Sequence, residues 1–319
     1  MPGLVPGIHA FGAAAQDVDG RDKPGHDKQS LIPMTLIQVI VGGLLLGAVY
    51  ALFSSGLTLI WGMMNVINFA HGEFVMIGMY VAFLIVTYVG GGPLVFGPIA
   101  GLLLFGFGIV VYYSLIRHVM RGPMLAQILS TFGLALLLRY LAFWIFTANF
   151  KTLPDDLLPG VINIGGILIG VPQLVAGTVA LVFTIGLHLL LTRSQIGSQL
   201  LAVAEDRQAA MLMGIRPDRM QAIAWGISGA GTGIAGALIA TFYYISPTVG
   251  ESLALTAFVV VAFGGFGSVP GAMVAGLLVG VIQSLSAYLL GPVYKDIVVY
   301  GLFVGLLWVR PQGLFGKAS

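Results

Sequence analysis

The sequence of 319 residues contains no cysteine, and charged residues are scarce throughout it. Without cysteine, the chain can form neither disulfides nor thiolate-ligated metal sites. Asp, Glu, Lys and Arg together make up 8% of the residues, whereas soluble domains contain about 25%. Hydrophobic residues make up 58%, and the mean hydropathy is +1.01. This composition excludes an ordinary soluble domain, and a net charge of +2 provides no basic face for nucleic acid.

Long apolar runs instead predict an all-α fold, a polytopic bundle of transmembrane helices. A run of roughly 17–25 apolar residues can cross a bilayer as a helix, and two of the runs here are shorter than that. We therefore expect about eight or nine membrane segments. The expected segments are Leu36–Trp61, Gly72–Tyr88, Ile99–Ile116, Leu125–Phe146, Leu174–Leu191, Gln221–Phe242, Leu253–Phe263, Gly271–Leu290 and Ile297–Val309.

Glycine is frequent, with 46 copies, and many glycines recur at every fourth position. Small residues at this spacing share one helix face and let two helix backbones approach closely, within a bundle or between subunits. We therefore expect tight helix packing. The stretches with this spacing are Gly43–Gly47, Gly229–Gly233–Ala237, Gly276–Gly280 and Gly301–Gly305.

The basic residues between the segments predict the orientation of the chain, because cytoplasmic loops carry an excess of Lys and Arg. If the crossings alternate, one side carries Arg117, Arg121, Arg193, Arg207, Arg216, Arg219, Arg310 and Lys317, and the other carries Lys151 and Lys295. We therefore expect the loop 192–220 and the C-terminus in the cytoplasm. The loop from Thr147 to Gln173 is expected outside.

The first 33 residues differ from the rest, because they are rich in Gly, Pro and Asp and contain no apolar stretch of the signal-peptide type. We expect residues 1–33 to be a disordered extension, and a start at Met34 would leave them out of the native protein. The alternative is a regulatory cytoplasmic tail. The membrane domain is expected to span residues 34–319.

The stretch AVAEDRQAAMLMGI, at 202–215, is charged in a chain that otherwise avoids charge. A helix from Ser198 to Gly214 is expected here, because a serine can cap its start, a glycine can end it and Pro217 blocks its continuation. At roughly 24 Å it is too short, and too charged, to cross the bilayer. Two interpretations remain open: a solvated loop whose arginines only fix the topology, or a rigid helix that docks into a partner.

Polar residues gather between the first two apolar segments, where Asn65, Asn68, His71 and Glu73 lie close together. Amides and a carboxylate shielded from lipid suit the lining of a pathway for a polar solute. A broken helix at this point would also expose backbone groups, as in many transporters. The alternative is that these residues cap helix ends at the membrane surface.

Two further features fall inside apolar runs. Glycines interrupt the stretch Phe263–Gly271, where Gly264, Gly265 and Gly267 predict a break close to a pathway or an ordinary tight loop. Arg139 lies in mid-segment, where a charge costs at least about 2.5–3.5 kcal/mol on insertion scales. It should face protein or water, and we favour snorkelling toward the membrane surface over a transport role.

Four stretches together resemble one known family. They are AVAEDRQAAMLMGI at 202–215, NVINFAHGEFVMIGMYVAF at 65–83, FGGFGSVPGAMVAGLLVG at 263–280 and VRPQGLFGK at 309–317. Their order and spacing resemble the permease subunits of ABC importers for branched-chain amino acids, in particular the H-type subunit. The resemblance runs from about Met34 to the end and does not cover the preceding residues.

This resemblance implies a multi-pass permease of the bacterial inner membrane that works with a second homologous permease, two ATPase subunits and a periplasmic binding protein. It also implies that the 202–215 stretch couples to the ATPase. The implied coupling residues are Ala204, Glu205, Asp206, Arg207, Met211, Leu212 and Gly214. The expected pathway residues are Asn65, Asn68, His71, Glu73, Gly264, Gly265 and Gly267. We expect no cofactor, metal or catalytic residue, because the sequence contains no GxxxxGK[ST] phosphate loop and ATP hydrolysis would take place on partner chains.

Other cargoes and mechanisms are alternatives. An importer of urea, short amides or other amino acids would look the same, since the binding protein largely sets selectivity. An ion-coupled secondary transporter would be expected to contain more intramembrane carboxylates than Glu73 and Glu251. A membrane enzyme would need a catalytic constellation, and the sequence offers no paired carboxylates, HExxH motif or serine–histidine arrangement.

Overall fold

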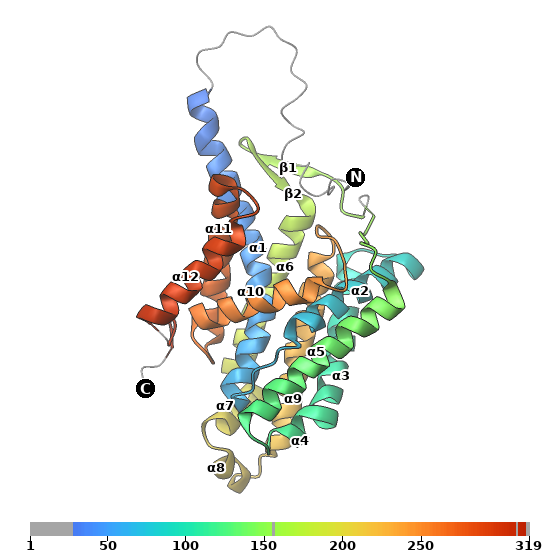
Figure 1. Ribbon diagram of the computed structural model, residues 1–319, viewed down its shortest axis with the longest axis vertical. Helices are drawn as coiled ribbons and strands as arrows, with labels where there is room; N and C mark the ends of the chain where they lie inside the picture. Colours follow the sequence, from blue (N-terminus) through green and yellow to red (C-terminus); the bar gives the residue numbers. More distant parts are fainter. Residues whose placement is uncertain (1–27, 155–156, 311, 317–319) are drawn as a thin grey trace.

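The computed structural model describes residues 28–154, 157–310 and 312–316, which form a nearly all-helical bundle (Figure 1). Seven helices in this part of the chain are long and apolar enough to cross a membrane. They are α1 (Lys28–Met64), α2 (His71–Tyr88), α3 (Pro93–Val111), α5 (Met124–Phe146), α6 (Val171–Arg193), α9 (Pro217–Ile239) and α11 (Val269–Leu290). With the shorter α10 (Val249–Gly264) and α12 (Lys295–Val309), they confirm the predicted transmembrane bundle.

The ends of several helices differ from the expected segments. A π-helical stretch, Tyr112–Ile116, and the short α4 (Arg117–Val119) continue α3. The first helix, α1, begins at Lys28, ahead of Met34, where we expected the membrane domain to start. The rest of the expected extension, residues 1–27, lies outside the described residues.

Glycine pairs set the closest helix contacts. A Cβ added to Gly43 in α1 would lie 2.8 Å from the Val281 Cα in α11, and one added to Gly276 would lie 2.7 Å from the Ala51 Cα. In α9, Gly229 and Gly233 likewise lie against the backbone of α3. The packing role is therefore confirmed for three of the four expected stretches. Gly301–Gly305 in α12 is different, because an added Cβ would meet nothing within 4 Å at either position.

Two sets of contacts place the loops on opposite ends of the bundle. Asp218, in the first turn of α9, pairs with Arg117 at 3.1 Å and with Arg207 at 2.9 Å, so the basic loops lie together. At the other end, Lys151 and Ile245 exchange two backbone hydrogen bonds, of 3.0 and 2.8 Å. We call the end with the arginines the cytoplasmic end, as the basic residues predict, and the opposite end the outer end.

The outer loop between α5 and α6 contains the strands of the described chain. β1 (Val161–Ile164) pairs antiparallel with β2 (Ile167–Gly170). Gly165 and Gly166 join the strands with φ values of 60° and 93°, which a two-residue hairpin turn requires. The sequence predicted a loop here and gave no sign of the two strands.

Candidate translocation and coupling sites

The chain breaks between α1 and α2 and folds back into the bundle. Asn65 follows the last residue of α1 and reverses the chain with a φ of 51°. His71 then begins α2, and its Nε2 lies 2.7 Å from the Phe53 carbonyl oxygen, about three turns before the end of α1. Asn68 and His71 are fully buried. The second helix therefore starts inside the protein, about three turns before the level at which α1 ends.

Hydrogen bonds hold this irregular segment in place. The Asn68 Oδ1 accepts a bond from the Ala70 N–H at 3.1 Å, and the Thr131 hydroxyl of α5 donates to the Ile67 carbonyl at 2.9 Å. Asn68 Nδ2 and His71 Nδ1 are buried without a hydrogen-bond partner among the described residues. These free polar atoms suit a place where water or a polar solute passes.

Three charged side chains meet at the start of α2. Arg139 of α5 donates from Nε and Nη2 to the Glu73 Oε1, at 3.0 and 2.6 Å, and from Nη1 to the Glu251 Oε2 of α10, at 2.8 Å. Glu73 is buried, whereas the Glu251 side chain is 65% exposed. Arg139 therefore bridges two carboxylates and does not snorkel. The sequence brought out each residue separately, but it gave no sign that they meet.

The glycine-rich stretch after Phe263 is a compact turn between α10 and α11. Gly265 and Gly267 have φ values of 89° and 83°, and the Ser268 hydroxyl caps α11 by accepting from the Gly271 N–H at 3.1 Å. The Leu314 N–H donates to the Phe263 carbonyl at 2.8 Å, so the C-terminal segment packs onto the turn. Glycine fits this turn because a Cβ at Gly264 or Gly265 would clash with neighbouring backbone, and because Gly267 has a positive φ.

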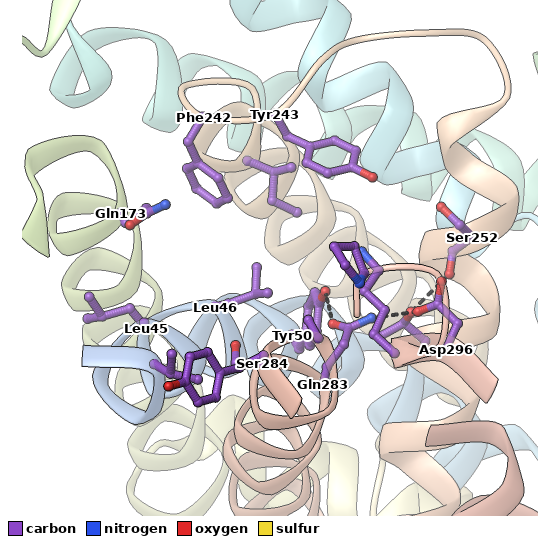
Figure 2. Close-up of a pocket in the computed structure, with 18 of the residues that line it drawn as sticks. Leu45, Leu46, Tyr50, Gln173, Phe242, Tyr243, Ser252, Gln283, Ser284 and Asp296 are labelled. Atoms are coloured by element: carbon purple, nitrogen blue, oxygen red, sulfur yellow. Dashed lines mark hydrogen bonds between the residues drawn. The ribbon is translucent and has the colours of Figure 1, made fainter. Parts of the chain in front are cut away.

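A cavity of about 560 Å³ opens among the outer ends of six helices: α1, α6, α9, α10, α11 and α12 (Figure 2). In its wall, the Tyr50 hydroxyl donates to the Gln283 Oε1 at 2.7 Å, and the Gln283 Nε2 donates to the Asp296 Oδ1 at 2.8 Å. Leu45, Leu46 and Phe242 give the opposite side an apolar character. The cavity thus offers both polar and apolar surface to a small amphipathic solute.

The sequence gave no prediction of this cavity, and none of the expected pathway residues lines it. The sequence contained one weak sign of the cavity, which was the presence of isolated polar residues, such as Gln283, within apolar helices. Tyr243 also lines the cavity, from the loop after α9. Burial, and then the hydrogen bond with Tyr244, raise the pKa of Tyr243, which therefore remains a neutral hydroxyl at physiological pH.

The charged stretch forms two helices, α7 (Gln195–Glu205) and α8 (Arg207–Leu212), where one was expected (Figure 1). Ser194, and not Ser198, caps α7. Asp206 interrupts the helix because its carboxylate accepts from the Gln208 and Ala209 N–H groups and so caps α8. Gly214 ends the unit with a φ of 81°, as expected.

The two helices have different surroundings. Leu200 and Val203 of α7 are buried against the cytoplasmic ends of α1, α6 and α9, and Ala204 packs beside them. In α8, Met211 is 50% exposed and Leu212 is 89% exposed. The unit is therefore fixed to the bundle on one side and presents apolar side chains on the other. Glu205 is exposed, and Arg207 pairs with Asp218.

Residues 39–307 match the family described as "Branched-chain amino acid transport system / permease component". The chain belongs to this permease family. It is 34% identical over 295 residues to the high-affinity branched-chain amino acid transport system permease protein BraD of Pseudomonas aeruginosa, covering 88% of this chain and 96% of BraD. It is 33% identical to the corresponding protein LivH of Escherichia coli, with the same coverage. No solved structure matches the chain.

The match to the permease family includes all the expected pathway and coupling residues, from Asn65 to Gly267. A more distant relative, the permease protein LivM of Escherichia coli, is 28% identical, covering 83% of this chain and 67% of LivM. Among the described residues, no group of three or more His, Cys, Asp or Glu is arranged to hold a metal ion. The chain is a multi-pass membrane protein of a transport family.

Proposed function

We propose that this chain is the permease subunit of an ABC importer that carries branched-chain amino acids across the inner membrane. The observation that carries this proposal is the match to the permease family over residues 39–307. The permease domain would span residues 34–319, with the extension before it outside this role. The chain would act as a transport subunit, and partner chains would hydrolyse ATP.

A second homologous permease is the first expected partner. The chain is similar to both LivH and LivM of Escherichia coli, each named as a permease protein of a high-affinity branched-chain amino acid transport system. Two related permeases in one organism support a hetero-dimer of homologous subunits around one pathway. Two ATPase subunits below and a periplasmic binding protein above would complete the importer.

The α7–α8 unit is suited to couple the ATPase to the membrane helices. Its exposed face combines apolar side chains, among them Leu212 and Met213 at 89% and 82% exposure, with nearby charges. Such a projection fits an apolar groove on a partner. Its buried face rests on α1, α6 and α9, so a movement of the docked ATPase would reach the bundle through packed contacts.

The pathway would connect the outer cavity with the break between α1 and α2. The cavity lies among the outer helix ends, where a binding protein would release its cargo. Further in, Asn65, Asn68, His71 and Glu73 would provide polar contacts, and the turn that contains Gly264, Gly265 and Gly267 would support the helices beside them. Polar groups at a broken helix are typical of transport sites.

The test is purification of the complex in mild detergent, followed by ATP-dependent leucine uptake in proteoliposomes. The double variant Leu212→Gln/Met213→Gln should lose the ATPase subunits and lower uptake by at least about tenfold, because it removes apolar contacts at the interface. These side chains are exposed, so the permease itself should still fold. We avoid Asp206 because it caps α8.

The matched control is Ile164→Gln, which changes an exposed apolar residue in the outer strand β1. It should leave ATPase binding unchanged. Retention of the ATPase by the double variant would refute the coupling role of α8. Leucine uptake by the permease alone, without ATP, would refute the ABC importer and favour a secondary transporter.

A further inference from the structure

The two ion pairs of Arg139 differ in kind. Glu73 is buried and accepts two of the three hydrogen bonds, so it holds the Arg139 guanidinium on its buried side. Glu251 accepts a single bond from Nη1, and its side chain is 65% exposed. The Arg139–Glu73 pair is therefore fixed, whereas Arg139 and Glu251 can separate and each bind another group.

The depth of this pair limits what its open side can face. Arg139 precedes the end of α5 by about two turns, roughly 10 Å along the axis. One turn after Glu251, Leu255 is 49% exposed, so apolar surface lies next to the exposed carboxylate. A carboxylate open to lipid at this depth would be costly, so this side of the pair should face water or another protein chain.

An aromatic cluster lies on the cytoplasmic side of the same pair. Phe132 precedes Arg139 by two turns of α5, and Phe258 follows Glu251 by two turns of α10. Phe69, from the broken segment, lies between them, with ring centroids 6.4 Å from Phe132 and 5.3 Å from Phe258. The ion pair and the three rings thus lie along the same two helices, as a strip with the charges at one end and the rings at the other.

We propose that this strip is a contact site for the amino acid on its way through the permease. The α-ammonium binds Glu251, the α-carboxylate binds Arg139, and the aliphatic side chain lies against Phe69, Phe132 and Phe258. This inference rests on the proposed function and adds the recognition groups for an apolar α-amino acid.

The zwitterion suits this exchange because it replaces one internal ion pair with two pairs of the same kind. The total charge of the site stays the same, and Glu73 keeps Arg139 in position throughout. A carboxylate alone would take Arg139 from Glu251 and leave the Glu251 carboxylate without its partner. A free amine alone would leave Arg139 with Glu73 and without a second carboxylate. The exchange therefore favours a solute that supplies both groups.

The experiment uses the complete importer in proteoliposomes with loaded binding protein, and measures leucine transported per ATP hydrolysed. Glu251→Gln should lower this ratio by at least about tenfold, because a charge-assisted hydrogen bond is lost. Assembly and the stimulated ATPase rate should remain normal, since α10 is separate from the α7–α8 unit. Glu251→Asp should restore part of the ratio, because it keeps the charge.

A second variant tests the apolar end of the strip. Phe132→Ala should lower the same ratio by about tenfold through lost side-chain contact. Its matched control is Phe183→Ala in α6, which changes another partly exposed ring in a membrane helix and should leave the ratio unchanged.

The inference is overturned if Glu251→Gln transports leucine normally. It is also overturned if transport and ATPase activity fall together in this variant, because Glu251 would then serve the structure or the coupling. Failure of the wild-type complex to import leucine with ATP would instead contradict the proposed function itself.

Discussion

At the scale of the residue, single glycines decide how closely the helices approach. Where a glycine faces another backbone, as Gly276 faces Ala51, even a methyl group has no space. Where the same residue faces outward, as Gly301 does, it only weakens its own helix. One substitution should therefore have opposite effects at the two positions.

Gly276→Ala should lower the free energy of unfolding by about 1–3 kcal/mol, because the new methyl group would lie 2.6 Å from the Ala51 backbone nitrogen. Gly301→Ala should raise it by about 0.5–1 kcal/mol through helix propensity. Unfolding of the purified subunit by SDS in mixed micelles measures both values. Equal effects of the two variants would contradict the packing described for α1 and α11.

At the scale of the element, the break between α1 and α2 depends on a neighbour far away in the sequence. The Thr131 hydroxyl of α5 binds the Ile67 carbonyl, which lies in the irregular segment and so lacks a helical partner. Where a helix is broken, its own N–H groups cannot bind the carbonyls left free, so the donor has to come from another element.

Thr131→Val keeps the shape of the side chain but removes this hydrogen bond. It should lower the free energy of unfolding by about 1–3 kcal/mol, because the Ile67 carbonyl loses its donor. Thr87→Val is the control, since the Thr87 hydroxyl binds the Phe83 carbonyl within its own exposed helix turn. The same SDS unfolding measurement applies, and a similar loss in both variants would show that the break does not depend on α5.

The sequence predicted the elements better than their contacts. Polar residues that interrupt an apolar run marked the break at Asn65, and caps marked the α7–α8 unit, although Asp206 divided it. The partners of Arg139 lie 66 and 112 positions away, and hydropathy and spacing carry no information at that separation. The outer cavity could not be predicted for the same reason, because residues from six helices line it.

At the scale of the whole molecule, the orientation of the bundle can be tested by labelling single introduced cysteines. The chain itself has no cysteine, so it adds no background label. Met213 is 82% exposed after α8, and Ile164 is 58% exposed in β1. Ile164→Cys should react with a membrane-impermeant maleimide on intact cells. In cells that make the permease without its ATPase subunits, Met213→Cys should react only after permeabilisation, because we expect the arginine-rich face in the cytoplasm. The reverse pattern would invert the proposed orientation.

The contact between α1 and α11 also sets an order of events during synthesis. Tyr50 and Gln283, which join these helices, are separated by 233 positions. The face of α1 that carries Gly43 and Gly47 therefore stays in the membrane without α11 while the ribosome makes most of the remaining chain. Contacts of such high sequence separation form late and leave incomplete chains open to wrong pairing. A chain truncated before α11 should accordingly be recognised by quality-control proteases as unfinished.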